Sequence, residues 1–250
     1  NGNDTMYSSS DADIVSGDDG DDTIYSGSGA DIVSGDDGDD TIYSGSGADT
    51  VSGDDGNDTI YGGAGADTVS GDDGNDTIYG GEGDDTISGD AGNDIIEGGA
   101  GNDVIMGGDG NNLAVFAGVQ SNYTFASSPD GLTITVTDTV NNYVDTVTGI
   151  ETLRFDDGDI YVSQDANGLV LTGGAGDDTI TVVGNVLVTL KGNDGDDTIV
   201  GGAGDDIIVG GLNDDIIIGG DGNDITLFAG QHSDYSFASS SDGRTVTVTN

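Results

Sequence analysis

The segments GDDGDDTIY (17–25), SGSGADIVS (26–34), GDDGDDTIY (35–43) and SGSGADTVS (44–52) are successive nine-residue units, and they decide the fold. The pattern continues to GGDGNNLAV (107–115), and between positions 17 and 79 it alternates with a period of two units. Self-similarity at a fixed period indicates a solenoid. We therefore predict that two units form one turn of a coil, which gives an 18-residue structural repeat.

Each unit follows the pattern Gly-Gly-x-Gly-x-Asp-x-U-x, in which U is a large apolar residue at position 8. Positions 7–9 are expected to form a short strand, in which position 8 points inward because neighbouring side chains alternate between faces. Position 8 is aliphatic in successive units: Ile24, Val33, Ile42, Val51, Ile60, Val69, Ile78, Ile87, Ile96 and Ile105. The pattern predicts an all-β fold, a parallel β-roll around a stacked aliphatic core.

A second array begins at GGAGDDTIT (173–181) and resumes at GNDGDDTIV (192–200), and the acid-free residues between them are expected to form a coil without an ion. The repeat is lost over residues 113–163. There we expect short antiparallel strands near Leu113–Val119, Tyr123–Ala126, Leu132–Thr137 and Thr152–Phe155. We predict a first β-roll at 1–115, an antiparallel β cap or linker at 116–163, a second β-roll at 164–227 and the start of a second cap at 228–250.

The sequence of residues 115–137 returns at residues 227–249, at a constant offset of 112. The parent protein is therefore expected to repeat on two scales. The chain also opens inside a repeat, without an initiator Met or a signal peptide, so we expect it to be a piece of a longer protein.

The composition excludes several partners. The chain has 49 acidic and 3 basic residues, and its formal charge is -46. Contacts to phosphate need Lys and Arg, so nucleic acid is excluded and an anionic membrane surface is disfavoured. Cysteine is absent, and no apolar run approaches the roughly 20 residues of a membrane span, so no membrane insertion is predicted. Regular apolar spacing in so acidic a chain predicts a fold that needs cations.

Position 6 supplies the candidate metal ligands. It is Asp in twelve successive units, and turns that are two units apart stack about 4.8 Å from one another on the same edge. Such a ladder of carboxylates would repel unless a hard dication lay between its members. Asp oxygens together with backbone carbonyls suit Ca²⁺. Glycines at positions 2 and 4 permit positive φ and let the carbonyls converge.

The predicted ligands lie on two edges. The first edge carries Asp4, Asp22, Asp40, Asp58, Asp76, Asp94 and, closing the row, Asn112. The second edge carries Asp13, Asp31, Asp49, Asp67, Asp85 and Asp103. The second array adds Asp178, Asp197, Asp206, Asp215 and Asp224. About fourteen Ca²⁺ ions in the gaps between stacked residues would cancel roughly 28 negative charges. Ser8-Ser9-Ser10-Asp11 lacks the turn glycines, so the site beside it is expected to be weak.

A dozen tandem copies in phase resemble the hemolysin-type calcium-binding nonapeptide repeats of RTX (repeats-in-toxin) proteins, over about 165 of the 250 residues. The segment DTVTGIETLRFDDG (145–158) resembles the cap that flanks such arrays. The resemblance implies type I secretion from a Gram-negative bacterium. It also implies that the chain stays unfolded in the low-calcium cytosol and folds extracellularly or at the cell surface.

Two functions fit this pattern. The 112-residue duplication favours a secreted, tandemly repeated structural or adhesive surface protein, such as an S-layer protein or adhesin. The alternative is the non-catalytic C-terminal module of an RTX enzyme or toxin, such as a metalloprotease, lipase, epimerase or haemolysin. Ion ligation explains the carboxylates, and His232 has no Ser or Cys signature near it, so no catalytic residue is predicted and the chain is not expected to be an enzyme. The predicted partners are calcium ions, with self-association or contacts to a cell surface or matrix as a further possibility.

A tyrosine row leaves two interpretations open. Position 9 of alternate units is Tyr7, Tyr25, Tyr43, Tyr61 and Tyr79. The row is either a stacked ladder that stiffens the sheet, or a flat aromatic surface for lateral packing against another roll or a ligand. Resemblance to ice-binding RTX adhesins is weak, because those carry Thr and Asn in the turn where this chain has mostly Asp, Ala or Ser.

Overall fold

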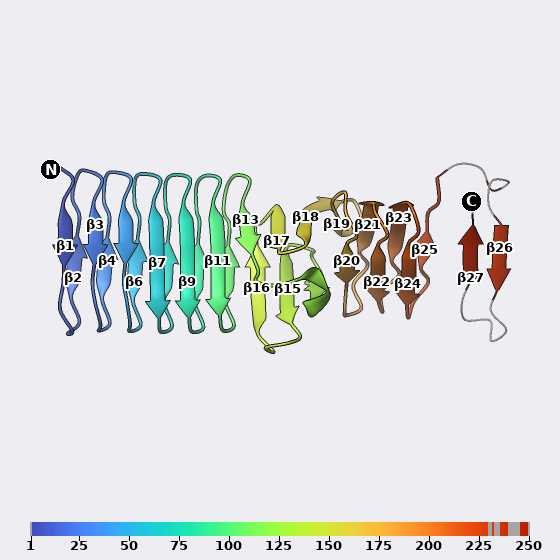
Figure 1. Cartoon of the computed structure of the whole chain (residues 1–250), viewed down its shortest axis with the longest axis horizontal. Coiled ribbons are helices and arrows are strands. Elements are labelled where there is room, and N and C mark those ends of the chain that lie inside the picture. The colour runs from blue at the N-terminus through green and yellow to red at the C-terminus, as the bar shows by residue number, and fades with distance from the viewer. Residues whose placement is uncertain (1, 230–231, 233–235, 240–245, 250) are drawn as a thin grey trace.

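The computed structural model describes residues 2–229, 232, 236–239 and 246–249, and it shows short strands stacked side by side along one long axis (Figure 1). The described residues include many strands and a short 3₁₀ helix, η1 (Gln120–Asn122). The prediction of an all-β parallel β-roll is confirmed. Within the described ranges, no helix has both the length and the apolar character to cross a membrane.

The first roll consists of two facing rows of strands. One row is β1 (Thr5–Tyr7), β3 (Thr23–Tyr25), β5 (Thr41–Tyr43), β7 (Thr59–Ala64), β9 (Thr77–Glu82), β11 (Ile95–Ala100) and β13 (Leu113–Val115). The other is β2 (Ile14–Ser16), β4 (Ile32–Ser34), β6 (Thr50–Ser52), β8 (Thr68–Ser70), β10 (Thr86–Ser88) and β12 (Val104–Met106). Each strand pairs in parallel with the strand one coil further on, as Ile24 does with Ile42. This register confirms the 18-residue coil.

The core lies between the two rows and is built from position 8. Ile24 and Ile42 from one row, and Val33 and Val51 from the other, are at most 2% exposed. Residues on either side of position 8 point outward, because strand neighbours alternate between faces. The aliphatic core that the spacing predicted is therefore present along the whole roll, with partial exposure in the first coil.

The insert continues both rows. β16 (Val144–Thr148) pairs in parallel with β12, and β17 (Thr152–Phe155) pairs in parallel with β13. β14 (Tyr123–Ser127) and β15 (Thr133–Asp138) are antiparallel, as predicted. The antiparallel prediction for Leu113–Val119 is wrong, because β13 still belongs to the coil and lies in parallel between β11 and β17.

Three further strands were not predicted as separate elements: β16, β18 (Gly158–Asp165) and β19 (Gly168–Thr172). β15 and β16 are antiparallel, as are β17 with β18 and β18 with β19. β19 then pairs in parallel with β21 (Thr189–Asp194) of the second roll. One thirteen-stranded sheet thus runs from β1 to β25, across the boundaries predicted near residues 115 and 163.

The second roll repeats the design of the first. β23 (Ile207–Leu212) and β25 (Ile225–Thr226) end the long sheet, and β20 (Thr179–Thr181), β22 (Thr198–Gly202) and β24 (Ile216–Gly220) form a three-stranded sheet. At the junction with the insert, the backbone N–H of Val183 donates to the carbonyl of Phe125 at 2.7 Å. In the acid-free coil, Val188 and Leu190 are buried. Its apolar side chains thus continue the core of the array.

Beyond β25, β26 (Ser236–Ser239) and β27 (Val246–Thr249) form an antiparallel pair in which Ser236 lies opposite Thr249. Subtracting 112 from both numbers gives Thr124 and Thr137, which also pair. The described part of the second cap therefore reproduces the register of β14 and β15. The remaining residues of that predicted cap lie outside the described ones.

Candidate metal sites

The position-6 aspartates form two rows, one along each edge of the first roll. In every gap between two of these aspartates, one carboxylate oxygen accepts the backbone N–H of the Asp one coil earlier. Asp40 donates to Oδ1 of Asp58 at 2.7 Å, and Asp49 donates to Oδ1 of Asp67 at 2.8 Å. The residues that were predicted to stack on each edge do lie next to one another. Their role as metal ligands remains a prediction.

The ends of the rows are more open than the middle. From Asp22 to Asp103 the position-6 aspartates are buried, whereas Asp4 is exposed and Asp13 is half-buried in the first coil. Asn112 is buried at the end of the first edge and accepts the N–H of Asp94 at 2.9 Å. The neutral amide therefore continues the row without adding charge.

The second roll repeats this geometry. The N–H of Asp178 donates to Asp197 at 2.9 Å, and the N–H of Asp197 donates to Asp215 at 3.2 Å. Asp206 is likewise bonded to Asp224, at 3.0 Å. In the acid-free coil, the N–H of Val188 takes the place of the Asp N–H and donates to Asp206 at 3.1 Å. The coil thus maintains the backbone pattern and supplies no carboxylate.

The second carboxylate oxygen of most of these residues is buried and has no hydrogen-bond partner. This holds for the Oδ2 atoms of Asp22, Asp31, Asp40, Asp49, Asp58, Asp67, Asp76, Asp85, Asp94, Asp103, Asp197 and Asp206. An uncompensated buried charge is costly, and proteins pair such charges or coordinate them to metals. Two rows of orphaned carboxylate oxygens therefore call for bound cations.

The electrostatics agree with this requirement. Burial raises the pKa of Asp58 to about 7, against the lowering effect of the N–H bond from Asp40, and the neighbouring carboxylates raise it further. The same causes raise the pKa of Asp67 to about 6 and that of Asp85 to about 6. Without a cation, these carboxyls favour the protonated form far more than free Asp does.

Glycine at position 1 leaves a small space beside most of the orphaned oxygens, which we call a cradle; beside Asp31 and Asp49, position 1 is Ser26 and Ser44. At Gly17, a Cβ would lie 2.5 Å from Oδ2 of Asp22 and 2.5 Å from the carbonyl oxygen of Gly35 in the next coil. At Gly201, the same point lies 2.5 Å from Oδ2 of Asp206 and 2.6 Å from the carbonyl oxygen of Gly219. A side chain at position 1 would therefore collide with both oxygens, and an orphaned carboxylate oxygen beside a backbone carbonyl is the kind of oxygen pair that Ca²⁺ prefers. The residues present therefore fit calcium.

Backbone carbonyls are needed to complete such sites. In the part of the chain that the structure describes, no three or more His, Cys, Asp or Glu side chains converge on one point. Each gap offers two carboxylates at most, and Ca²⁺ takes about 6–8 oxygen ligands. The arrangement is thus a repeated site shared between side chain and backbone.

Two acidic residues of the insert extend the rows and were missed in the sequence. The N–H of Asp103 donates to Oδ1 of Asp145 at 2.9 Å, and the N–H of Asn112 donates to Oε2 of Glu151 at 2.7 Å. Burial raises the pKa of Asp145 to about 7, as in the repeats. Asp145-Thr146-Val147 does match positions 6–8 of a unit, but it follows Asp103 after a much longer interval than the two units that separate stacked residues in the array.

Gln120 caps the second roll in a similar way. Its Nε2 donates to Oδ1 of Asp178 at 2.9 Å, and its Oε1 accepts the N–H of Thr179 at 2.8 Å. The side-chain amide of Gln120 thus makes the hydrogen bonds that the backbone of a preceding coil would make to Asp178 and Thr179. Nothing in the repeat pattern identified this residue.

Aspartates replace the expected glycine at position 2 of the first edge. Asp18, Asp36, Asp54, Asp72 and Asp90 all adopt the left-handed conformation, with φ between 65° and 69°. The hydroxyl of the position-9 Ser from the preceding coil donates to each of the last four; the bond from Ser70 to Asp90 measures 2.6 Å. The Asp side chains therefore tie the turns of neighbouring coils together. Asn213 likewise occupies a glycine position with positive φ, as its residue type allows.

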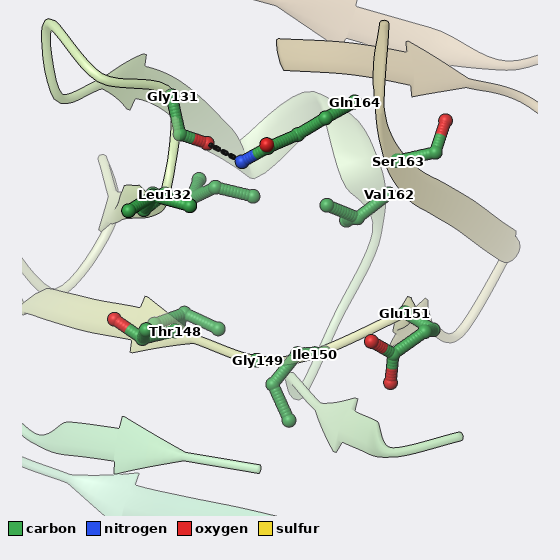
Figure 2. Close-up of a pocket in the computed structure, with 11 residues that line it drawn as sticks. Gly131, Leu132, Thr148, Gly149, Ile150, Glu151, Val162, Ser163 and Gln164 are labelled. Atoms are coloured by element: carbon green, nitrogen blue, oxygen red, sulfur yellow. Dashed lines mark hydrogen bonds between the residues drawn. The ribbon is translucent and has the colours of Figure 1, made fainter. Parts of the chain in front are cut away.

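A cleft in the insert is the main alternative to the edge sites. It is lined by apolar side chains that include Leu132 and Val162, and Gln164 closes one side by donating to the carbonyl of Gly131 at 2.7 Å (Figure 2). Figure 2 shows that Glu151 and Ser163 do not point toward each other. The Glu151 carboxylate already accepts the N–H of Asn112. The cleft therefore lacks the convergent groups that the edges possess.

Comparisons with known proteins bear on the type of repeat. A family profile described as RTX calcium-binding nonapeptide repeat (4 copies) matches residues 1–33, 16–51, 43–78, 52–87, 79–114, 170–182 and 191–225, together more than half of the chain. Comparison with curated proteins gives no match. Among solved structures, the extracellular lipase LipA from Serratia marcescens shares 26% identity at a TM-score of 0.36, over 72% of this chain and 34% of the lipase chain. The chain belongs to the family of RTX calcium-binding nonapeptide repeat proteins.

Proposed function

We propose that this chain is a calcium-stapled β-roll region of a secreted, tandemly repeated bacterial structural or adhesive surface protein, and that it folds on binding calcium after export. One observation carries the proposal. The Oδ2 atoms of two stacked Asp rows are buried without a partner, and most of them face a cradle at position 1. A dication there would supply the charge that the folded chain lacks.

Within a gap, the ligands assigned to calcium are the two stacked Asp residues and the carbonyl of position 1 in the next coil. The gap between Asp22 and Asp40 illustrates the set, with the carbonyl of Gly35 as its backbone member. The chain positions these oxygens through its own hydrogen bonds, because each Asp is oriented by the N–H of the previous coil. Bound calcium would supply positive charge between coils and hold them together.

Folding then depends on the metal. In the unfolded chain the two Asp residues of a gap are separated by two full units of sequence, so no site exists before the coils stack. Binding free energy at such sites becomes folding free energy. A chain with a formal charge of -46 is therefore expected to stay extended at low calcium and to fold at the higher calcium concentration outside the cell.

The structural or adhesive role is supported by the continuity of the fold. One sheet passes through both rolls and the insert, and the cap hairpin recurs at a constant offset of 112. RTX repeat segments are structural rather than catalytic. A rod that extends by repeating rolls and caps suits a protein that spans distance at a cell surface.

A calcium titration followed by far-UV circular dichroism tests the folding proposal, with magnesium in parallel as the control. The expected result is a cooperative transition from coil to β structure that calcium drives and magnesium does not. Mg²⁺ is expected to fail because it demands near-ideal octahedral geometry and dehydrates reluctantly. A chain that is already β-rich in chelator, or that responds equally to magnesium, would contradict the proposal.

A further inference from the structure

The first roll joins the insert at one point on each edge. On the second edge, the last repeat aspartate, Asp103, donates its N–H to Oδ1 of Asp145 at 2.9 Å. On the first edge, Asn112 donates its N–H to Oε2 of Glu151 at 2.7 Å. Both acids belong to the insert, and each stands where a following coil would place its position-6 residue. The two junctions therefore share one backbone contact and differ in the side chains of Asp103 and Asn112.

The first-edge junction is closed by the side-chain amide of Asn112. Its Oδ1 accepts the N–H of Asp94 at 2.9 Å, and its Nδ2 donates to the carbonyl of Gly149 at 3.2 Å. Both polar atoms of this buried side chain thus have protein partners. Because neutral groups bond to one another across this junction, it contains no buried charge that needs a cation.

The second-edge junction has the opposite character. Asp103 is 1% exposed, and although its Oδ1 accepts the N–H of Asp85 at 2.9 Å, its Oδ2 is buried without a hydrogen-bond partner. Asp145 is 7% exposed, so a second carboxylate lies in the same buried region. Burial raises the pKa of Asp145, and the charges of Asp103 and Asp138 raise it further. The gap between Asp103 and Asp145 therefore has the same unmet charge as the gaps within the repeats.

A cavity of about 350 Å³ borders this gap, and Gly98, Tyr143 and Asp145 are among the residues that line it. Gly98 is position 1 of the unit that contains Asp103, and a Cβ there would collide with Oδ2 of Asp103. At Gly80, one coil earlier, a Cβ would also lie 2.5 Å from the carbonyl oxygen of Gly98, whereas the three atoms nearest to a Cβ at Gly98 all belong to Asp103. The junction thus lacks this close carbonyl, and the cavity leaves room for water to supply oxygen ligands in its place.

Asp138 lines the same cavity, but its carboxylate is already engaged. Its Oδ1 accepts the N–H of Val140 at 2.7 Å, and its Oδ2 accepts the Nδ2 of Asn141 at 2.7 Å. The carboxylates available to an ion at this junction are therefore those of Asp103 and Asp145, two in number as in each gap of the repeats.

We propose that a calcium ion between Asp103 and Asp145 fastens the insert to the first roll on the second edge, whereas the amide of Asn112 fastens it without metal on the first edge. This inference rests on the proposed function, since it assumes that the stacked Asp pairs of the repeats hold calcium. It adds a site that the repeats alone do not contain, because the second carboxylate comes from β16 of the insert. Docking of the insert on the roll then depends on calcium at one edge only.

The test is the number of calcium ions bound by the full chain, counted by native mass spectrometry in saturating calcium. Asp145→Ala removes the second carboxylate of the junction and is expected to bind one ion fewer than the wild type. Glu151→Ala is the matched control, because it removes the acceptor of the Asn112 N–H at the other junction, and its ion count is expected to equal that of the wild type. Each variant loses one hydrogen bond between roll and insert, so a purely structural role of Asp145 would leave both ion counts unchanged.

Asn112→Asp is a second, independent variant that tests the same site rule by a gain of binding. The substitution places a carboxylate oxygen beside the carbonyl of Gly149, where the wild type has a bonded amide nitrogen, and one additional ion is expected. An Asp145→Ala chain that binds as many ions as the wild type, or an Asn112→Asp chain that gains none, would overturn the inference while the repeat sites still fill. A chain that binds no calcium in any variant would overturn the proposed function itself.

Discussion

The two oxygens of a position-6 aspartate have different environments. In Asp58, Oδ1 accepts the N–H of Asp40 at 2.7 Å, while Oδ2 is buried without a partner. Asn112 supplies the natural comparison, because its Oδ1 accepts the N–H of Asp94 in the same way and its amide nitrogen is neutral. The carboxylate is therefore not needed to form the backbone contact. What it adds is a negative charge facing the gap.

Asp58→Asn is expected to separate the two effects of that charge. In chelator the variant should form β structure at a higher pH than the wild type, because one desolvated charge is removed. In calcium it should melt lower and bind one or two fewer ions, because Asp58 borders two gaps. An ion present at about 100 times its Kd is worth about 2.7 kcal/mol. Far-UV circular dichroism against pH in chelator and thermal melts in calcium measure the two effects. The exposed Asp39→Asn serves as the control, and equal shifts in the two variants would contradict this assignment.

Asp72 allows a test of the left-handed turn. Its φ is 66°, a region that glycine adopts freely and that costs other L-residues about 1–2 kcal/mol. Asp72→Gly is expected to be nearly neutral, because relief of strain offsets the lost hydrogen bond from Ser52. Asp72→Val is expected to destabilise the folded state by more than about 1 kcal/mol. Chemical denaturation in saturating calcium measures the difference, and equal stability of the two variants would show that backbone strain does not act at this turn.

At the scale of strands, the repeat made most of the structure predictable. Position 8 gives the buried face, and the 18-residue period gives the partner of each strand, as the pairing of Ile24 with Ile42 shows. The insert was harder, because its strands are fixed by their partners and not by a period. β16 lies beside β12 only because Asp145 and Val147 occupy repeat positions after a long excursion. The direct signal, Asp145-Thr146-Val147, is too short to stand out without the phase of the array.

The tyrosine row shows how far side-chain prediction extended. The five rings do stack, with Tyr25 and Tyr43 at 4.8 Å between centroids and 3° between planes. Stacking follows from identical residues in register, which the period predicts. The side chains of Gln120, Asp145 and Glu151 that continue the rows could not be predicted in that way, because each comes from a different segment of the insert.

Tyr43→Ala is expected to destabilise the roll by about 1 kcal/mol, because it removes two stacking contacts from one sheet. If the row is an internal ladder, the variant lowers the melting temperature and leaves the sedimentation coefficient unchanged. Tyr161→Ala, an exposed tyrosine of β18 outside the row, is the matched control. Concentration-dependent association of the wild type that disappears in Tyr43→Ala would instead support the lateral packing surface.

For the whole molecule, the charge of -46 and the buried carboxylates couple folding to both pH and calcium. Burial raises the pKa of Asp40 to about 6, that of Asp76 to about 6 and that of Asp58 to about 7. A carboxyl whose pKa is higher in the folded state than in the unfolded state stabilises the fold fully at a pH below its unfolded-state pKa, here 3.8. This contribution is lost as the pH rises through the folded-state pKa. Without calcium, the roll should therefore be more stable in acid than at neutral pH.

Calcium reverses this dependence, because the ion needs ionised carboxylates and protons compete with it between about pH 4 and 7. In chelator, far-UV circular dichroism is expected to show β structure increasing as the pH falls from about 8 to about 5, as the raised pKa values are crossed. When folding is titrated with calcium, the calcium concentration at the midpoint is expected to rise as the pH falls over the same interval. A β signal in chelator that does not change with pH would mean that the folded state does not retain protons on these rows. In that case protons could not replace calcium as the counter-charge that allows the coils to stack.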